Sequence, residues 1–258
     1  MTPWGFGFKR ALPSQKDDSI KMMTAETHVL EVWGDFACFT RPELKVERFS
    51  YPVITPSAAR GVFDAIYCKP VEFRWQITLV EVLKPVQYIA LRRNEMKGRI
   101  TEGTVLKWAR GTMPVTPVWA DGDEEGTGRT QRQTMALKDV RYRLHAQMVP
   151  WQASLSGKVN GEFRRRANAG KCFAQPSFGL REFPAYFEVV NDASAPAAPV
   201  SWDADLGWML YDVFDLSRQG NSCDAPSVSI FRAVVQKGRM VVPEFSSPDV
   251  RKVEAVAQ

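Results

Sequence analysis

An α+β fold in the order strand–helix–strand–strand–helix–strand is predicted from three features of this 258-residue sequence. Four segments alternate apolar and polar residues as half-buried strands do, and two segments carry apolar residues at helical spacing. The length suits one domain or two closely packed ones. The predicted order is that of the ferredoxin-like arrangement, shared by RNA-recognition modules, in which both helices cover one face of the sheet.

The first half of the pattern is a strand followed by a helix. Residues 27–39 are rich in β-branched and aromatic side chains, as expected of a strand. Thr55 is suited to cap a helix and Pro56 to occupy its first position. Apolar residues then follow at helical spacing until Lys69 and Pro70, which we expect to lie beyond the end of this helix.

Two strands, a second helix and a fourth strand complete the order. Alternation predicts that one face of the second strand carries Phe73, Trp75, Ile77 and Leu79. The third strand is expected from about Ala136 to Val149, with Val140, Tyr142, Leu144, Ala146 and Met148 on one face and Arg141, Arg143, His145 and Gln147 on the other. Asn160 is expected to cap the second helix and Gly170 to end it. The fourth strand is expected from Phe183 to Val189.

The remaining segments suggest three parts of the chain. Residues 1–22 are expected to form a mobile N-terminal extension, and residues 23–195 the ferredoxin-like domain. Within that domain, residues 91–130 form a long hairpin insertion with basic flanks and an acidic tip. A linker rich in Ala and Pro leads to a small C-terminal β domain over residues 196–258, with an antiparallel β-sheet and a hairpin at Lys237-Gly238.

The composition indicates a cytoplasmic protein without a membrane segment, a metal or a cofactor. Its four cysteines form no CxxC pair, and no stretch approaches the roughly 18 apolar residues of a membrane span. No P-loop, GxSxG or HExxH motif occurs. The acidic segment 121–126 begins like a calcium loop, but the position that needs a bidentate glutamate is Arg132.

Positive charge is concentrated in one part of the chain. The 34 Lys and Arg exceed the 29 Asp and Glu by only 5. Residues 129–182 alone hold 11 basic and 3 acidic residues, an excess of 8, so the rest of the chain sums to −3. A run such as Arg164 to Arg166 is often no more than a solvated helix face, but basic residues of the third strand join it. Phe173 and Gln175 beside it could stack on a base or hydrogen-bond to it, so the pattern favours nucleic acid.

Several long stretches resemble one known family. They include VWGDFACFTRPELKVERFSYPVITPSAARG (32–61), TQRQTMALKDVRYRLHA (130–146) and FRRRANAGKCFAQPSFGLREFPAYFE (163–188). In these stretches the chain resembles the Cas-five subunit of type I-C (Dvulg) CRISPR systems, a RAMP-superfamily protein. The resemblance implies a repeat-specific endoribonuclease that processes precursor CRISPR RNA, stays on the guide RNA and joins other subunits in the type I-C surveillance complex. It also implies metal-independent cleavage, in which the 2′-hydroxyl attacks the neighbouring phosphate.

The resemblance also implies catalytic residues. Tyr67 and Lys158 match the family's positions, but the histidine that should follow the lysine is Val159. Lys158 would then supply proton and charge while Tyr67 orients the 2′-hydroxyl, and His145 is a possible substitute for the missing histidine. On this interpretation Val159→His should accelerate cleavage. The alternatives are that Tyr67 is a core aromatic and Lys158 an ordinary loop cation.

The residues expected to contact RNA are Arg60, Arg132, Lys138, Arg141, Arg143, Arg164, Arg165, Arg166, Lys171, Phe173, Gln175 and Arg181. Two other functions stay open from the sequence. The first is a non-catalytic or weakly catalytic RNA-binding subunit of the same complex, which the valine at position 159 favours. The second is a general binder of duplex DNA, which rests on the basic residues alone.

Overall fold

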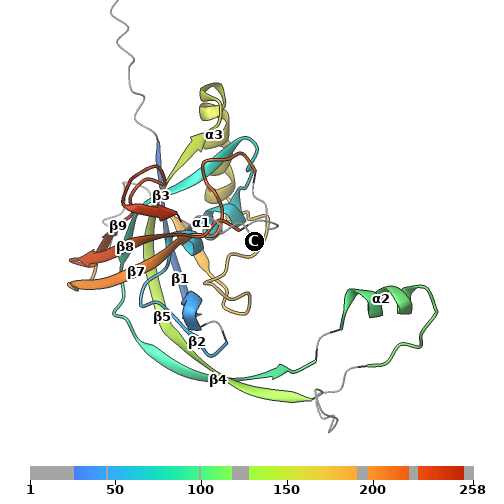
Figure 1. Ribbon diagram of the computed structural model, residues 1–258. Helices are drawn as coiled ribbons and strands as arrows, with labels where there is room; N and C mark the ends of the chain where they lie inside the picture. The colour runs from blue at the N-terminus through green and yellow to red at the C-terminus, as the bar shows by residue number, and fades with distance from the viewer. Residues whose placement is uncertain are drawn as a thin grey trace, which may run out of the picture.

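The computed structural model describes residues 26–44, 46–98, 100–117, 128–190, 197–220 and 226–252. The predicted N-terminal extension and the acidic tip at 121–126 lie outside these residues. The described part is an α+β structure, mostly antiparallel sheet, with three α-helices (Figure 1). Among its helices none is long and apolar enough to cross a membrane.

Four strands form the centre of the sheet. They are β1 (Thr27–Ala37), β3 (Phe73–Val82), β5 (Arg129–Pro150) and β6 (Tyr186–Val189). Their order is β6-β1-β5-β3, and each neighbouring pair is antiparallel. From Val140 onward the predicted alternation of β5 is confirmed for the apolar residues, because Val140, Tyr142, Leu144, Ala146 and Met148 are buried; on the other face Arg143 is buried as well.

Helices α1 (Pro56–Ile66) and α3 (Ser156–Asn168) contact the central strands. Short 3₁₀ turns, η1 (Pro42–Leu44) and η2 (Ala153–Leu155), precede them. The predicted cap of α1 is confirmed, since the Thr55 side chain accepts a hydrogen bond from the Ala58 amide. The predicted cap of α3 is wrong: the helix begins at Ser156, and Asn160 lies inside it, buried. Gly170 follows the end of α3 with φ 63°, where a side chain would be strained.

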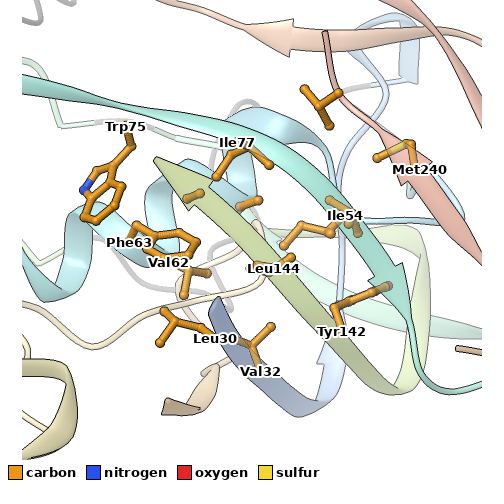
Figure 2. Packing of buried hydrophobic residues seen from close by; sticks show 14 of the residues in the cluster. Leu30, Val32, Ile54, Val62, Phe63, Trp75, Ile77, Tyr142, Leu144 and Met240 are labelled. Atoms are coloured by element: carbon orange, nitrogen blue, oxygen red, sulfur yellow. The ribbon is translucent and has the colours of Figure 1, made fainter. Parts of the chain in front are cut away.

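The core lies between α1, α3 and one face of the sheet. Figure 2 shows Val62 and Phe63 of α1 directed at the strands, close to Leu30 and Leu144. Burial of such side chains is the main favourable term in folding. The face predicted for β3 needs one correction: a bulge between Ile77 and Leu79 reverses the alternation, so the last buried residues of the strand are Val80, Glu81 and Val82.

The predicted insertion is an arm that extends from the sheet (Figure 1). Strand β4 (Tyr88–Met96) pairs with the first part of β5, which therefore begins seven residues before the predicted Ala136. Strand β2 (Arg48–Phe49) pairs with β5 at the base of the arm. Beyond β4 lies α2 (Glu102–Ala109), a helix in which no residue is buried.

The C-terminal strands do not form the separate sheet that the sequence suggests. They are β7 (Ala204–Asp212), β8 (Ser229–Gln236), β9 (Arg239–Val241) and β10 (Val250–Lys252). Strand β9 pairs with the outer edge of β3, so that the backbone groups of this edge are satisfied and one ten-stranded sheet results. Met209, Phe231 and Met240 belong to the same buried cluster as the residues under α1. The division into two domains at residue 195 stays a prediction.

Candidate functional site

A groove of about 420 Å³ lies between α1 and the segment of residues 171–181. Small residues of α1 line one side of it: Ala58, Gly61 and Ala65. The opposite side carries three of the predicted RNA-binding residues: Phe173, Gln175 and Arg181. The structure therefore brings together an aromatic ring, an amide and a cation, which are groups that bind single-stranded nucleic acid.

Backbone hydrogen bonds hold the 171–181 segment against the end of α1. The amides of Phe173 and Ala174 both donate to the carbonyl of Ala65, at 2.6 and 3.2 Å. The Gln175 side chain donates to the carbonyl of Ala185 at 3.0 Å. Phe173 is nevertheless 86% exposed. A large apolar ring held in water by a well-anchored backbone is the strongest sign of a ligand surface in this region.

The polar groups in the groove are suited to binding and not to nucleophilic attack. Cys68 is exposed as a residue, but partial burial of its thiol, together with Asp64, raises the thiol pKa to about 12. The thiol therefore stays protonated at neutral pH. Lys171 and Arg181 are exposed, and neither has an ion pair within the described residues. These two cations are therefore available to phosphate groups.

Tyr67 lies at the C-terminal end of α1 and is buried, with only 5% of its surface exposed. Its ring packs against Phe73, with centroids 5.3 Å apart, and the Arg166 guanidinium lies 5.6 Å from its centroid. Burial raises the pKa of the Tyr67 hydroxyl, so the group is neutral and suited to donate a hydrogen bond. The cations near Tyr67 are thus Arg166, whose guanidinium faces the ring, and Lys69, two residues further along the chain.

Among the described residues, no hydrogen bond or ring contact joins the predicted pair of Tyr67 and Lys158. Lys158 is exposed in the first turn of α3, eight residues before Arg166, which corresponds to about 12 Å along a helix axis. Val159 beside it is fully buried in the core. This burial argues against the expectation that Val159→His would accelerate cleavage, because the side chain points into the protein.

His145, the possible substitute for the missing histidine, lies on β5 and contacts Glu81. It lies on the face of β5 opposite to Leu144 and Ala146, which are buried on the side of the helices. Its Nε2 lies 3.5 Å from the Glu81 carboxylate, and burial lowers its pKa. The sheet therefore separates His145 from Lys158.

Two of the predicted RNA-binding arginines are parts of the fold. Arg60 is 7% exposed and pairs with Asp212 at 2.7 Å and with Asp64, which ties α1 to β7. Arg143 is 5% exposed and pairs with Glu81 at 2.7 Å. Buried arginines with such partners are not free to bind phosphate.

The other predicted cations lie at or near the surface, some with acidic partners. On α3, Glu162 accepts hydrogen bonds from Arg165 and Arg166, and these lower its pKa to about 2. Arg164 lies 3.1 Å from Glu26. The Arg132 side chain contacts Glu95 in the arm, and Lys138 is exposed on β5. In the part of the chain that the structure describes, no group of three or more His, Cys, Asp or Glu could hold a metal ion.

Gly61 was not predicted as a site residue, although a glycine inside a predicted helix is a signal that the position has a packing or functional role. It lies inside α1, exposed, and a side chain added there would meet nothing within 4 Å. Glycine in a helix costs about 1 kcal/mol relative to alanine. At this position it widens the groove.

Comparison with known proteins shows the family of this chain. Residues 27–243 match the family described as CRISPR-associated protein (Cas_Cas5), and the chain belongs to this family. A CRISPR pre-crRNA endoribonuclease Cas5d of Mannheimia succiniciproducens is 41% identical over 233 residues, which are 86% of this chain and 97% of the relative. The protein of the same description from Thermus thermophilus is 40% identical over 186 residues, 71% of this chain and 72% of the relative.

Solved structures support the fold alone. A crystal structure of a CRISPR-associated protein has a TM-score of 0.58 and 19% identity, covering 88% of this chain and 97% of the other. A functionally uncharacterized protein from Streptococcus mutans has a TM-score of 0.55 and 20% identity over the same shares.

Proposed function

We propose that this chain cuts precursor CRISPR RNA within its repeat and holds the product in the groove between α1 and the 171–181 segment. The relatives described as pre-crRNA endoribonucleases, at 40% and 41% identity, support the activity. The exposed Phe173, fixed beside Arg181 in the groove, is the observation that supports the position of the RNA.

The proposed chemistry uses the RNA's own 2′-hydroxyl. Its oxygen attacks the adjacent phosphorus, the bond to the 5′-oxygen breaks, and a cyclic phosphate and a 5′-hydroxyl result. A base must take the 2′ proton, an acid must protonate the leaving oxygen, and cations must stabilise the extra negative charge. We infer that Arg166, held by Glu162 and the Tyr67 ring, supplies positive charge at the end of α1. Lys158 then acts on a more distant part of the RNA.

We also infer a ferredoxin-like core. The antiparallel order β6-β1-β5-β3, with α1 between β1 and β3 and α3 between β5 and β6, supports this topology. The C-terminal strands would be an extension of that core's sheet.

The arm supports a role as a subunit of the surveillance complex. It carries α2 away from the sheet (Figure 1), with Val105 49% and Leu106 45% exposed. Exposed apolar side chains on an isolated helix are suited to contact another protein. We propose that the guide RNA and the other subunits of a type I-C complex are the partners of this chain.

One experiment tests the nuclease against the binding-only alternative. The purified chain is incubated with its repeat RNA in EDTA, and the product ends are mapped. We expect cleavage that persists in EDTA, yields a cyclic phosphate and disappears when the 2′-hydroxyl at the cut site is replaced by hydrogen. Activity that is lost in EDTA and restored by magnesium would contradict the proposed chemistry. Tight binding of uncut RNA under all conditions would identify a binding subunit instead.

A further inference from the structure

The face of the sheet opposite to α1 and α3 carries a row of three cross-strand neighbours: Arg141, Trp33 and Tyr186. Trp33 of β1 is paired in register with Arg141 of β5 on one side and with Tyr186 of β6 on the other. Trp33 lies between Val32 and Gly34, both on the buried side, so its ring faces away from the helices.

The three side chains of this row form a continuous surface. The rings of Trp33 and Tyr186 are inclined by only 29°, with centroids 6.4 Å apart. The Arg141 guanidinium lies 5.4 Å from the Trp33 centroid, and its Nε donates to the Glu31 carboxylate at 2.6 Å. Glu31 thus holds the cation beside the indole, and little side-chain freedom is left to lose when a ligand binds.

The row is open, whereas the next row along the strands is covered. There Arg143 donates to the carbonyl of Ala197 at 2.9 Å and is only 5% exposed, because the chain passes over it. Tyr186, by contrast, is 52% exposed, and the Arg141 side chain is 41% exposed. The fold therefore leaves one aromatic row of this face accessible.

We propose that this row is a stacking platform for an unpaired base of single-stranded RNA, separate from the groove on the helix side. The base stacks on the exposed Tyr186 ring, and Arg141 contacts a neighbouring phosphate. The stacked rings of Trp33 and Tyr186, with the Arg141 guanidinium over the indole, form a row that a further base can extend by stacking on Tyr186. Aromatic side chains on the open face of a four-stranded sheet bind bases in this way. The proposal rests on the proposed function only in that its ligand is RNA.

The test measures binding of a fluorescein-labelled octauridylate, which lacks the repeat sequence. Tyr186→Ala should weaken its affinity by about 5- to 100-fold, because loss of one stacked base costs about 1–3 kcal/mol. Tyr186→Phe keeps the ring and should bind within about twofold of the natural protein, whereas Tyr186→Leu, similar in bulk but without a π-system, should behave like Tyr186→Ala. Trp208→Ala is the matched control: Trp208 is also exposed, at 45%, and lies under Arg251, but it is on β7 and outside the row.

The proposed platform would be overturned if a folded Tyr186→Ala or Tyr186→Leu variant bound octauridylate as tightly as the natural protein does. A variant that keeps its RNA affinity but loses co-purification with other protein chains would also overturn it, since the row would then bind protein. The repeat-cleavage assay of the natural protein separates this proposal from the nuclease. If octauridylate binding depends on Tyr186 but the natural protein does not cut repeat RNA, the platform alone is supported. If the natural protein cuts repeat RNA but octauridylate binding does not depend on Tyr186, the nuclease alone is supported.

Discussion

The two ends of α3 differ in what surrounds them, although both carry basic residues. At the first end, Val159 and Asn160 are buried, and the Asn160 amide oxygen lies 2.6 Å from Nε2 of the buried His28. At the last end, the Arg165 side chain is 60% exposed, and the segment that follows presents Phe173 to solvent. The first end holds the helix to the sheet, and the last end leads into the segment that lines the groove.

The difference shows that a motif position gives chemistry only when its side chain reaches the site. Lys158 and Val159 are neighbours in sequence, yet one is exposed and the other is part of the core. Substitutions of the buried residues at the first end should therefore change stability, and those at the last end and in the segment after it should change RNA binding. The predictions below test this division, from the largest expected effect to the smallest.

Val159→His should destabilise the protein without accelerating cleavage. The larger, polar ring would enter a full core without a prepared partner, so we expect the free energy of unfolding to fall by about 2–4 kcal/mol. Denaturant unfolding measures this change. Lys158→His, one residue away on the surface, is the matched control and should change stability by no more than about 0.5 kcal/mol. A stable Val159→His variant that cuts RNA faster would show that this end faces the site after all.

Gly61→Leu should weaken repeat-RNA binding by about 5- to 100-fold, because its side chain would project into the groove and displace a stacked base worth about 1–3 kcal/mol. The affinity is measured with uncleavable repeat RNA. Gly61→Ala is the control: it adds one methyl group in open space, and it should raise the free energy of unfolding by about 0.5–1 kcal/mol while RNA binding stays close to natural. Equal RNA affinities of the Gly61→Leu and Gly61→Ala variants would show that the RNA does not bind in the groove.

Much of the fold could be predicted from the sequence because it depends on local patterns. The alternation of β5 and the Thr55 cap each follow from neighbouring residues. The start of α3 could not be predicted from Asn160, since that side chain is used by His28, 132 residues away. The β9–β3 pairing is also long-range, and no local pattern specifies it.

The site was predictable in its residue types and less so in its geometry. The sequence predicted Lys171, Phe173, Gln175 and Arg181 as RNA-binding residues, and the structure places Phe173, Gln175 and Arg181 at one groove. That they bind RNA stays a prediction. The sequence around Arg60 and Arg143 does not distinguish them from exposed arginines, because the carboxylates that pair with them come from distant strands. Trp33 and Tyr186 fall within the predicted strands 27–39 and 183–189 and were not predicted as site residues. The side of the sheet that Trp33 faces is given by the burial of Val32 and Gly34 in the structure.

The double variant Lys171→Ala/Arg181→Ala should reduce the salt dependence of RNA binding. Each phosphate contact to single-stranded RNA contributes about 0.7 to the slope of log affinity against log salt, so the loss should be about 1.4. Binding is measured across a series of salt concentrations. Arg232→Ala is the control: it also removes a surface cation, a 68% exposed arginine on β8, and it should leave the slope unchanged. A slope that does not change in the double variant would show that these cations lie outside the RNA path.

Stability should decrease as the pH falls below 6.5, because of His28 at the first end of α3. The Asn160 amide nitrogen donates to the Ser156 carbonyl, so the Asn160 amide oxygen accepts a hydrogen bond from Nε2–H of the neutral His28. Burial lowers the pKa of His28 from 6.5, so below that pH the unfolded chain binds a proton that the folded chain refuses. The free energy of unfolding should fall by at most about 1.4 kcal/mol per pH unit from this group, until the pH reaches the lowered pKa.

The chain has only two histidines, so the source of this pH dependence can be separated. Burial also lowers the pKa of His145, which contributes in the same direction. His28→Gln keeps a donor for Asn160 and removes the titration, and His145→Gln is the matched control on the other face of the sheet. Unfolding is measured by denaturant at pH 7.5, 6.5 and 5.5. We expect His28→Gln to flatten the fall below pH 6.5 more than His145→Gln does, since His28 is 6% exposed and the His145 side chain 22%. An unchanged fall in His28→Gln would mean that the first end of α3 accepts the charged imidazole and is looser than its burial indicates.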